Sequence, residues 1–292
     1  MMENVKKVCE YILFIMLIVM ITAMVVMLRL QSKRQDHDYV TIHSAQDLYD
    51  EFYRCVYSFE PCMYVKTDSY EEFNDYWQQL SDSYTIHSVF REGNGQYRYR
   101  ETNKGCYVDF TIYYNACGQA MQYLYAKNVD EYPSGKAQNV GEQLLSIKES
   151  LITDDMDDVE KVKKIHDYIV SSYRYNVRGE GYECWTAETL LNTGAATCQG
   201  YSEAFTALCL LSGVECRVVT GTSTSGSSSE GHAWTQVKIS SNWYHVDVTW
   251  DDPIPDTPGM VRYDYFMKSD LALEYTHTWS EYFEKCYMDY AS

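Results

Sequence analysis

The fold is decided by the stretch from Gly231 to Pro253, which reads GHAWTQVKISSNWYHVDVTWDDP. Two runs rich in β-branched and aromatic residues flank a polar turn, so we expect two antiparallel strands. This turn places positions at about 248–250 opposite His232 on the neighbouring strand. Asp247 is then one diagonal step away, and a small bulge in the pairing would let its carboxylate orient the imidazole. His245 shares a face with Asp247 and competes for the same carboxylate.

A cysteine lies upstream, at the start of a predicted helix. Cys198 is followed by Gln-Gly-Tyr-Ser and then by a helical pattern that ends at Gly213. The dipole and the unpaired backbone N–H groups of a helix N-terminus favour a thiolate, and the same groups can stabilise an oxyanion. Cys209, inside this helix, has neither advantage and is expected in the core. Cys198, His232 and Asp247 together meet the logic of nucleophile, base and orienting acid, although each alone is also common in buried cores.

Three motifs follow one another in the chain: Cys198-Gln-Gly-Tyr-Ser202, Gly231-His-Ala-Trp234, and Trp243 to Pro253. Together with Tyr265-Phe-Met-Lys-Ser-Asp270 and Trp279, they resemble the transglutaminase-like superfamily over residues 155–282. Within it, the chain is most similar to the bacterial transglutaminase/protease-like proteins of the cytokinesis-type branch. The resemblance implies an α+β fold with a papain-like cysteine protease core, in which an antiparallel sheet accompanies the nucleophile helix.

The same resemblance implies the roles of individual residues. It places the nucleophile at Cys198, the base at His232 and the orienting acid at Asp247, and it implies that no metal or organic cofactor is needed. The sequence departs from the family pattern at Thr235, where Asn more often follows the His-Ala-Trp run. This departure concerns a local hydrogen bond rather than the three site residues. No motif assigns a second oxyanion donor, and none ties Trp185 to that role.

The implied reaction begins when the Cys198 thiolate attacks a carboxamide or peptide carbonyl and forms a thioester. An amine would resolve the thioester into a cross-link, whereas water would give hydrolysis. The substrate class is a protein or a cell-wall peptide. The alternative is a catalytically idle transglutaminase-like fold that acts as a surface interaction module through its tyrosine-rich N-terminal part. The sequence does not give the oligomeric state.

The first half of the chain changes from helical to strand-like periods. Helices are expected from Ser44 to Val56 and from Asp68 or Ser69 to Leu80. Strands are expected over 84–90, 96–100 and 106–114, with a hairpin turn at 92–95. A later helix carries His166, which we expect to be structural rather than catalytic. The serine-rich run from Thr222 to Ser229, TSTSGSSS, is expected to form a flexible loop between two strands. The expected organisation is an anchor over 1–34, a stalk over 35–43, a small α+β domain over 44–150 and a transglutaminase-like catalytic domain over 151–292.

The charge of the chain excludes one class of partner. The 292 residues carry a formal charge of −18, with 24 basic and 42 acidic side chains. Residues 1–34 hold five of the basic and two of the acidic groups, so the remainder carries 19 and 40, a formal −21. Nucleic-acid binding requires Lys and Arg to neutralise phosphates, and this body would repel them. We therefore expect no nucleic-acid partner.

The N-terminus contains a candidate membrane span. Tyr11 to Leu28 is a run of 18 residues without a charge. As a helix it would measure ~27 Å, close to the ~30 Å thickness of a hydrocarbon core. No small-residue cleavage site follows it, so an uncleaved signal anchor is favoured over a cleaved signal peptide. We expect a single-pass cell-membrane protein whose catalytic domain is extracellular.

The cysteines allow two interpretations. The chain has ten, and Cys9 precedes the expected span. Apart from Cys198, eight remain, and they either pair as disulfides or are buried as small apolar thiols. The sequence leaves both alternatives open.

Overall fold

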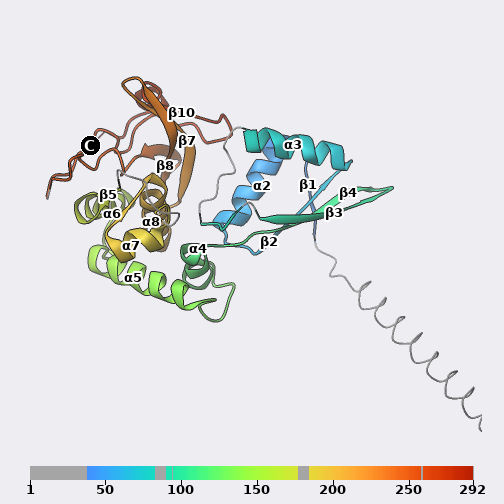
Figure 1. The fold of residues 1–292 in the computed structure, drawn as a ribbon, viewed down its shortest axis with the longest axis horizontal. Helices are drawn as coiled ribbons and strands as arrows, with labels where there is room; N and C mark the ends of the chain where they lie inside the picture. Colours follow the sequence, from blue (N-terminus) through green and yellow to red (C-terminus); the bar gives the residue numbers. More distant parts are fainter. Residues whose placement is uncertain (1–37, 83–89, 94, 177–183, 258, 292) are drawn as a thin grey trace, which may run out of the picture. The chain divides into compact units, whose positions relative to one another are not determined.

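The N-terminal part of the described chain combines two amphipathic helices with a four-stranded sheet (Figure 1). The computed structural model describes residues 38–82, 90–93, 95–176, 184–257 and 259–291. Helix α2 (Ala45–Tyr57) begins after Ser44, whose Oγ accepts a hydrogen bond from the Asp47 backbone N–H. Helix α3 (Tyr70–Asp82) begins after Ser69, whose Oγ accepts one from the Glu72 N–H. Both predicted helices are thus confirmed, with the predicted cap at Ser44, and Ser69 rather than Asp68 caps the second.

The sheet of this part has the strand order β1-β2-β4-β3. Its strands are β1 (Val40–Thr41), β2 (Cys62–Thr67), β3 (Gln96–Thr102) and β4 (Gly105–Thr111). Alternate side chains of β2 and β4 are buried. Phe52 of α2 and Trp77 of α3 both pack on Phe110 of β4, with ring centroids 6.0 and 5.0 Å away. The sequence analysis did not predict β2, and the strand expected over 84–90 lies outside the described residues apart from Phe90.

A series of helices leads from this sheet to the second half of the chain. They are α4 (Ala116–Met121), a π-helical turn (Gln122–Ala126), α5 (Gly135–Leu151), α6 (Asp158–Ser172) and α7 (Ala187–Thr193). Helix α6 begins with a capping box, in which Asp157 Oδ1 accepts from the Glu160 N–H and Glu160 Oε2 accepts from the Asp157 N–H. A short parallel pair, β5 (Arg174–Tyr175) and β6 (Ala195–Ala196), connects the end of α6 to the residues before α8.

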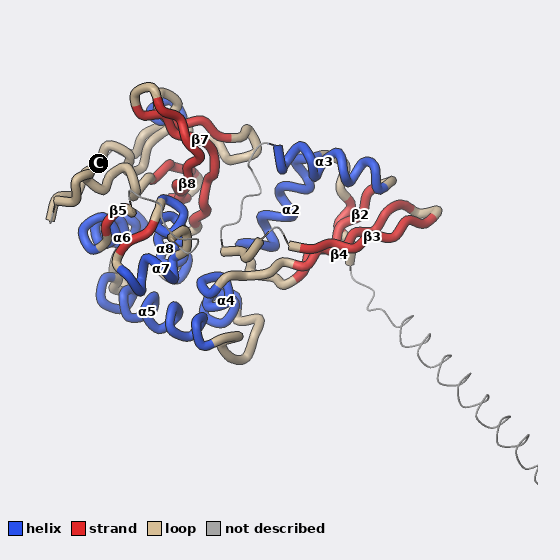
Figure 2. Tube along the Cα trace, viewed as in Figure 1, coloured by secondary structure: helices blue, strands red, loops and turns tan. Residues whose placement is uncertain are grey.

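Helix α8 (Cys198–Leu211) packs against strands β7 and β8 (Figure 2). These two strands belong to a second sheet of order β10-β7-β8-β9. The strands are β7 (Cys216–Ser225), β8 (Ser228–Ile239), β9 (Asn242–Val246) and β10 (His277–Trp279), and the short helix α9 (Asp270–Leu273) precedes β10. Helices α5, α6 and α7 also pack against α8. All residues from Gly200 to Leu210 are consequently buried. A helix buried on all sides is expected to be apolar around its whole circumference, as this one largely is.

Two expectations for this sheet are corrected. Residues 222–229 were expected to form a flexible loop, but they belong mainly to β7 and β8, which a tight turn joins at Gly226. Gly226 has a φ of 62°, a conformation that glycine adopts without strain. The second of the two strands predicted within Gly231–Pro253 ends at Val246 and does not continue toward Pro253. Asp247 therefore lies in the turn after β9 and not on a strand.

The described elements form a mixed α+β fold, as predicted. Val40–Ser292 is one compact unit, and the division into two domains at residue 150 stays a prediction. The anchor over 1–34, with its span at 11–28, lies outside the described residues. Among the helices that the structure describes, none has the length and apolar character needed to cross a membrane.

The cysteines of the described residues are free thiols. They are Cys55, Cys62, Cys106, Cys117, Cys184, Cys198, Cys209, Cys216 and Cys286. Cys62 and Cys198 are half-buried, and the other seven are buried. Of the two interpretations of the cysteines, the structure thus has the one in which they pack as small apolar residues.

A buried carboxylate connects α8 to the preceding elements. Glu203 is fully buried, and its Oε1 accepts hydrogen bonds from the Phe90 backbone N–H at 2.9 Å and from Asn115 Nδ2 at 2.6 Å. Its Oε2 accepts one from the Ala187 N–H at 2.6 Å. Burial raises the pKa of Glu203, and the hydrogen bonds from these three N–H donors oppose that rise by favouring the carboxylate. Glu203 therefore holds the helix that begins at Cys198 in a fixed relation to α7 and to the N-terminal part.

Replacing Glu203 with Gln tests this connection. The amide keeps one oxygen acceptor but turns an NH2 group toward one of the buried donors. We expect Glu203→Gln to lower the free energy of unfolding by about 2 kcal/mol at pH 7. Urea denaturation would measure the loss, with Glu149→Gln on the exposed surface of α5 as the matched control. A variant as stable as the control would contradict the role given to Glu203.

Candidate active site

Cys198 is the first residue of α8, and its side chain is half-buried. The glycine two positions later explains how this helix end is accommodated. A Cβ at Gly200 would lie 2.7 Å from Ala196 Cβ and 2.8 Å from Thr186 O, so only glycine permits this approach. Ser202 Oγ donates to the carbonyl oxygen of Ala233 at 3.0 Å and ties the first turns of α8 to β8. Cys198 is thus held at the helix N-terminus, as predicted.

The structure brings His232 and Asp247 together. The register of β8 with β9 pairs Thr235 with Val246, which extrapolates to position 249 opposite His232, within the predicted range. His232 Nε2 lies 2.7 Å from Asp247 Oδ2. The strand ends at Val246, and the following turn directs Asp247 toward β8, so no bulge in the pairing is involved. His232 is 7 % exposed and Asp247 is fully buried.

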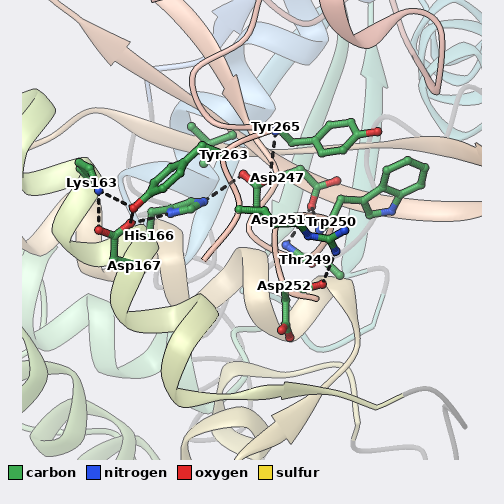
Figure 3. A network of polar contacts seen from close by, with 12 residues as sticks. Lys163, His166, Asp167, Asp247, Thr249, Trp250, Asp251, Asp252, Tyr263 and Tyr265 are labelled. Atoms are coloured by element: carbon green, nitrogen blue, oxygen red, sulfur yellow. Dashed lines mark hydrogen bonds and ion pairs between the residues drawn. The ribbon is translucent and has the colours of Figure 1, made fainter. Parts of the chain in front are cut away.

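Asp247 is surrounded by hydrogen-bond donors. Its Oδ1 accepts hydrogen bonds from the backbone N–H groups of Thr249 at 3.0 Å and Trp250 at 3.1 Å, in the turn drawn in Figure 3. Its Oδ2 is shared by His232 and by a second imidazole, His277, whose Nε2 lies 3.1 Å away. A buried carboxylate with donors on both oxygens is held in one orientation.

These contacts determine the charges of His232 and Asp247. Burial alone would lower the pKa of His232, but the Asp247 carboxylate and the neighbouring Cys198 thiol raise it to about 10. Burial alone would raise the pKa of Asp247, but His232 and His277 hold it well below its ordinary value. His232 is therefore an imidazolium at neutral pH. Since Nε2 faces Asp247, Nδ1 is the ring nitrogen left for the hydrogen bond with Cys198.

The competitor for Asp247 is His277 and not His245. His245 accepts a hydrogen bond from Trp234 Nε1 at Nδ1, 2.9 Å away, and its Nε2 lies 3.0 Å from Asp270 Oδ1. The sequence analysis did not identify His277, which follows Asp247 by 30 residues. Its only local signal is the His277-Thr-Trp279 alternation of a short strand, in which Trp279 alone belonged to the family pattern. Trp185 is 45 % exposed on the segment before α7, and its role as an oxyanion donor stays unassigned.

Comparison with known families identifies this region. Residues 146–248 match the model of the transglutaminase-like superfamily. This segment is a transglutaminase-like domain. It contains Cys198, His232 and Asp247, whereas His277 lies beyond the matched range. Members of the superfamily are cysteine-nucleophile enzymes, and this relationship confirms the predicted superfamily.

Individual relatives cover limited parts of the chain. Over 111 residues, it is 31 % identical to the kyphoscoliosis peptidases of Homo sapiens and Mus musculus, a match that covers 34 % of this chain and 17 % of theirs. A solved structure of a TGase aligns with a TM-score of 0.34 and 15 % identity, over 72 % of this chain and 59 % of the other. The periplasmic domain of TgpA from Pseudomonas aeruginosa, bound to ethylmercury, aligns with a TM-score of 0.31 and 12 % identity, over 56 % and 69 %.

Two side-chain clusters in and beside the transglutaminase-like domain have the composition of metal sites. They are His232, Asp247 and His277, and His245, Asp270 and Cys286, each with ligand atoms within 4.8 Å of one another. In the second, Trp234 donates to His245 Nδ1, so Nε2 must carry a proton and cannot bind a metal in this tautomer. In the first, both imidazoles already share the Asp247 oxygen by hydrogen bonds. The expectation that the domain uses no metal or cofactor stays a prediction.

Another buried histidine supports the turn that carries Asp247 (Figure 3). His166 of α6 is fully buried, with Nε2 3.1 Å from Asp251 Oδ2 and Nδ1 3.1 Å from Asp167 Oδ1. The Asp251 backbone N–H in turn donates to Asp247 O. His166 thus bridges α6 and the turn, and it contacts none of the three predicted site residues directly in the described hydrogen bonds. This arrangement agrees with the structural role expected for His166.

The charge of His166 follows from its two partners. Burial opposes the imidazolium, but the hydrogen bonds and charges of Asp167 and Asp251 raise the pKa of His166 above its ordinary value. Burial also raises the pKa of Asp251 above its ordinary value. Of the two carboxyl groups, Asp167 is therefore the one that more readily supplies a negative charge to His166. Despite partial burial, hydrogen bonds from His166, Lys163 and Tyr263 lower the pKa of Asp167 to about 2.

The raised pKa of His166 makes its contribution to stability dependent on pH. A group whose pKa is higher in the folded state stabilises the fold fully below its unfolded pKa of about 6.5, and this stabilisation is lost as pH rises through the folded value. We expect His166→Gln to cost about 3 kcal/mol at pH 5.5 and distinctly less at pH 9. Urea unfolding of wild type and variant at both pH values, with exposed His43→Gln as control, measures this. A cost that is independent of pH would contradict it.

The charge of His232 is expected to depend on Asp247. In Asp247→Asn, the counter-charge is gone while the burial remains, so the pKa of His232 should fall from about 10 to below its ordinary value of about 6.5. An NMR titration of ¹⁵N-labelled histidine in the two proteins measures the change. Asp256→Asn removes the same charge from an exposed loop position and should leave the titration as it is in wild type. A His232 pKa that stays near its wild-type value in Asp247→Asn would refute this electrostatic account.

Proposed function

We propose that the chain is a membrane-anchored, surface-facing enzyme in which Cys198, His232 and Asp247 form a catalytic triad. The observation that carries the proposal is the buried 2.7 Å hydrogen bond between His232 and Asp247, formed beside a cysteine at a helix N-terminus. The match to the transglutaminase-like superfamily supports the choice of a cysteine nucleophile. The raised pKa of His232 supports an imidazolium beside the Cys198 sulfur, and a helix N-terminus favours the thiolate form of a cysteine placed there.

The reaction follows from this arrangement. The Cys198 sulfur attacks the carbonyl carbon of a carboxamide or peptide, and the backbone N–H groups at the start of α8 face the developing oxyanion. The tetrahedral intermediate collapses when the His232 imidazolium gives its proton to the leaving amine, and a thioester remains. An incoming amine or water then loses a proton to His232 as it displaces the sulfur. Asp247 holds the ring and stabilises its cation throughout.

The location and substrate class belong to the same proposal. The uncharged run from Tyr11 to Leu28 supports an anchor. An N-terminal anchor in front of a globular domain usually leaves that domain outside the cell. The substrate is then a protein or cell-wall peptide outside the cell. The human relative is named a peptidase, which favours hydrolysis, although the match spans only 17 % of its length.

A catalytically idle interaction module is the second candidate. Tyr99, Tyr113, Tyr123 and Tyr125 of the N-terminal part are between 36 % and 50 % exposed. Exposed tyrosines are frequent in protein interfaces. This candidate predicts that Cys198 has the reactivity of an ordinary thiol.

Alkylation distinguishes the two candidates. At pH 6.5, iodoacetamide should modify Cys198 at least about tenfold faster than free cysteine, because the ion pair supplies thiolate where a free thiol is largely protonated. His232→Ala should abolish this excess. Mass spectrometry of the digested protein follows Cys198, and half-buried Cys62 in the same sample serves as the internal reference. A Cys198 that reacts no faster than free cysteine would overturn the enzyme proposal.

A second experiment separates transfer from hydrolysis. The full chain is incubated with a cell-wall extract and a labelled primary amine. Covalent incorporation of the label identifies a transferase, whereas release of free acid or cleaved peptide identifies a hydrolase. Cys198→Ala provides the blank for both products.

A further inference from the structure

His277 is placed at the site without facing the nucleophile. It is 1 % exposed, and its Nε2 lies 3.1 Å from Asp247 Oδ2. Its Nδ1 lies 2.8 Å from Thr276 Oγ1. Both ring nitrogens are therefore engaged, and neither is left for the Cys198 thiol. Any influence of His277 on Cys198 must act through Asp247.

The protons on the two imidazoles can be assigned from their common partner. Asp247 is ionised, because the donors around it hold its pKa well below the ordinary value against the effect of burial. An ionised carboxylate has no proton to donate. Both His232 Nε2 and His277 Nε2 must then carry hydrogen and donate to Oδ2. Asp247 Oδ2, which binds the proposed base His232, thus accepts hydrogen bonds from two imidazoles.

The position of His277 is itself enforced by the sheet. Strand β10 pairs with β7, with Trp279 opposite Gly221. A Cβ at Gly221 would lie 2.0 Å from Thr278 O and 3.1 Å from Trp234 Cη2, so glycine is required for β10 to approach and for the Trp234 ring to lie there. The rings of Trp234 and Trp250 then contact His277 at centroid distances of 4.9 and 4.7 Å.

We propose that His277 is a positioning residue that fixes the Asp247 carboxylate in the orientation from which it binds His232. This inference rests on the proposed function of Cys198, His232 and Asp247. Oδ1 is held by backbone N–H groups of the turn, and His277 supplies the second donor that holds Oδ2. Without it, a buried charged oxygen loses a donor, and the carboxylate can rotate away from the geometry that His232 requires.

Two substitutions separate the hydrogen bond from the packing. His277→Phe keeps an aromatic ring between Trp234 and Trp250 but removes the N–H. His277→Gln places an amide N–H near the position of Nε2. In the full chain at pH 6.5, we expect roughly a tenfold slower alkylation of Cys198 in His277→Phe and recovery of most of the rate in His277→Gln. Equal rates in wild type and His277→Phe, or no recovery in a folded His277→Gln, would overturn the proposal.

A second readout does not depend on chemistry at Cys198. In the Cys198→Ser protein, the proton between His232 and Asp247 should give a downfield imidazole N–H resonance, which His277→Phe broadens or shifts and His277→Gln restores. An unchanged resonance in His277→Phe would refute positioning by His277. If His277→Phe fails to fold, the resonance and alkylation rate of His277→Gln must still match wild type. If wild-type Cys198 alkylates slowly, the proposed function fails on its own, whereas the N–H resonance still decides the role of His277.

Discussion

The arrangement of the site depends on one buried negative charge. Asp247 has no exposure to solvent, and an ionised carboxylate in such a position is stable only when donors replace the water it has lost. Those donors come from separate parts of the chain: β8 supplies His232, β10 supplies His277, and the turn after β9 supplies the N–H groups of Thr249 and Trp250. The requirement to satisfy two oxygen atoms thus brings three segments of the second sheet into one geometry.

Helix α8 carries a second buried carboxyl group that constrains its position. Its buried Glu203 must also be satisfied, and its donors come from Phe90, Asn115 and Ala187. The glycine at position 200 allows close contact with the segment before α7. The cysteine end of α8 is therefore located by polar contacts and by close backbone approach, in addition to its apolar packing against the sheet. Precise placement of a reactive group on a rigid element is what a preorganised site requires.

Local patterns in the sequence were sufficient for some of these features. The capped helices at Ser44 and Ser69 and the two strands around the turn at 240–242 follow from short-range periodicity, and the register of those strands brought Asp247 near His232. The sequence did not predict where β9 ends, because the change from strand to turn after Val246 is stabilised by Thr249 and Trp250 donating to Asp247 itself.

Long-range contacts explain the remaining differences. His277 could not be found from local pattern, since its only link to the site is a hydrogen bond across 30 residues. The loop expected over 222–229 forms a hairpin because its serines and threonines are paired along the ladder of β7 and β8, and composition alone does not reveal such pairing. Similarly, β2 becomes evident only through its pairing with β4 and β1.

The unpaired cysteines have a consequence for how the molecule responds to oxidants. No disulfide contributes to the fold of the described residues, so reducing conditions remove nothing from it. Seven of these thiols are buried, and burial raises the pKa of several, including Cys117, Cys209 and Cys286. Protonated, inaccessible thiols oxidise slowly, whereas an accessible cysteine beside an imidazolium oxidises readily. Peroxide would therefore oxidise Cys198, the nucleophile proposed above, before the buried thiols of the core, and the molecule would lose that proposed function while remaining folded.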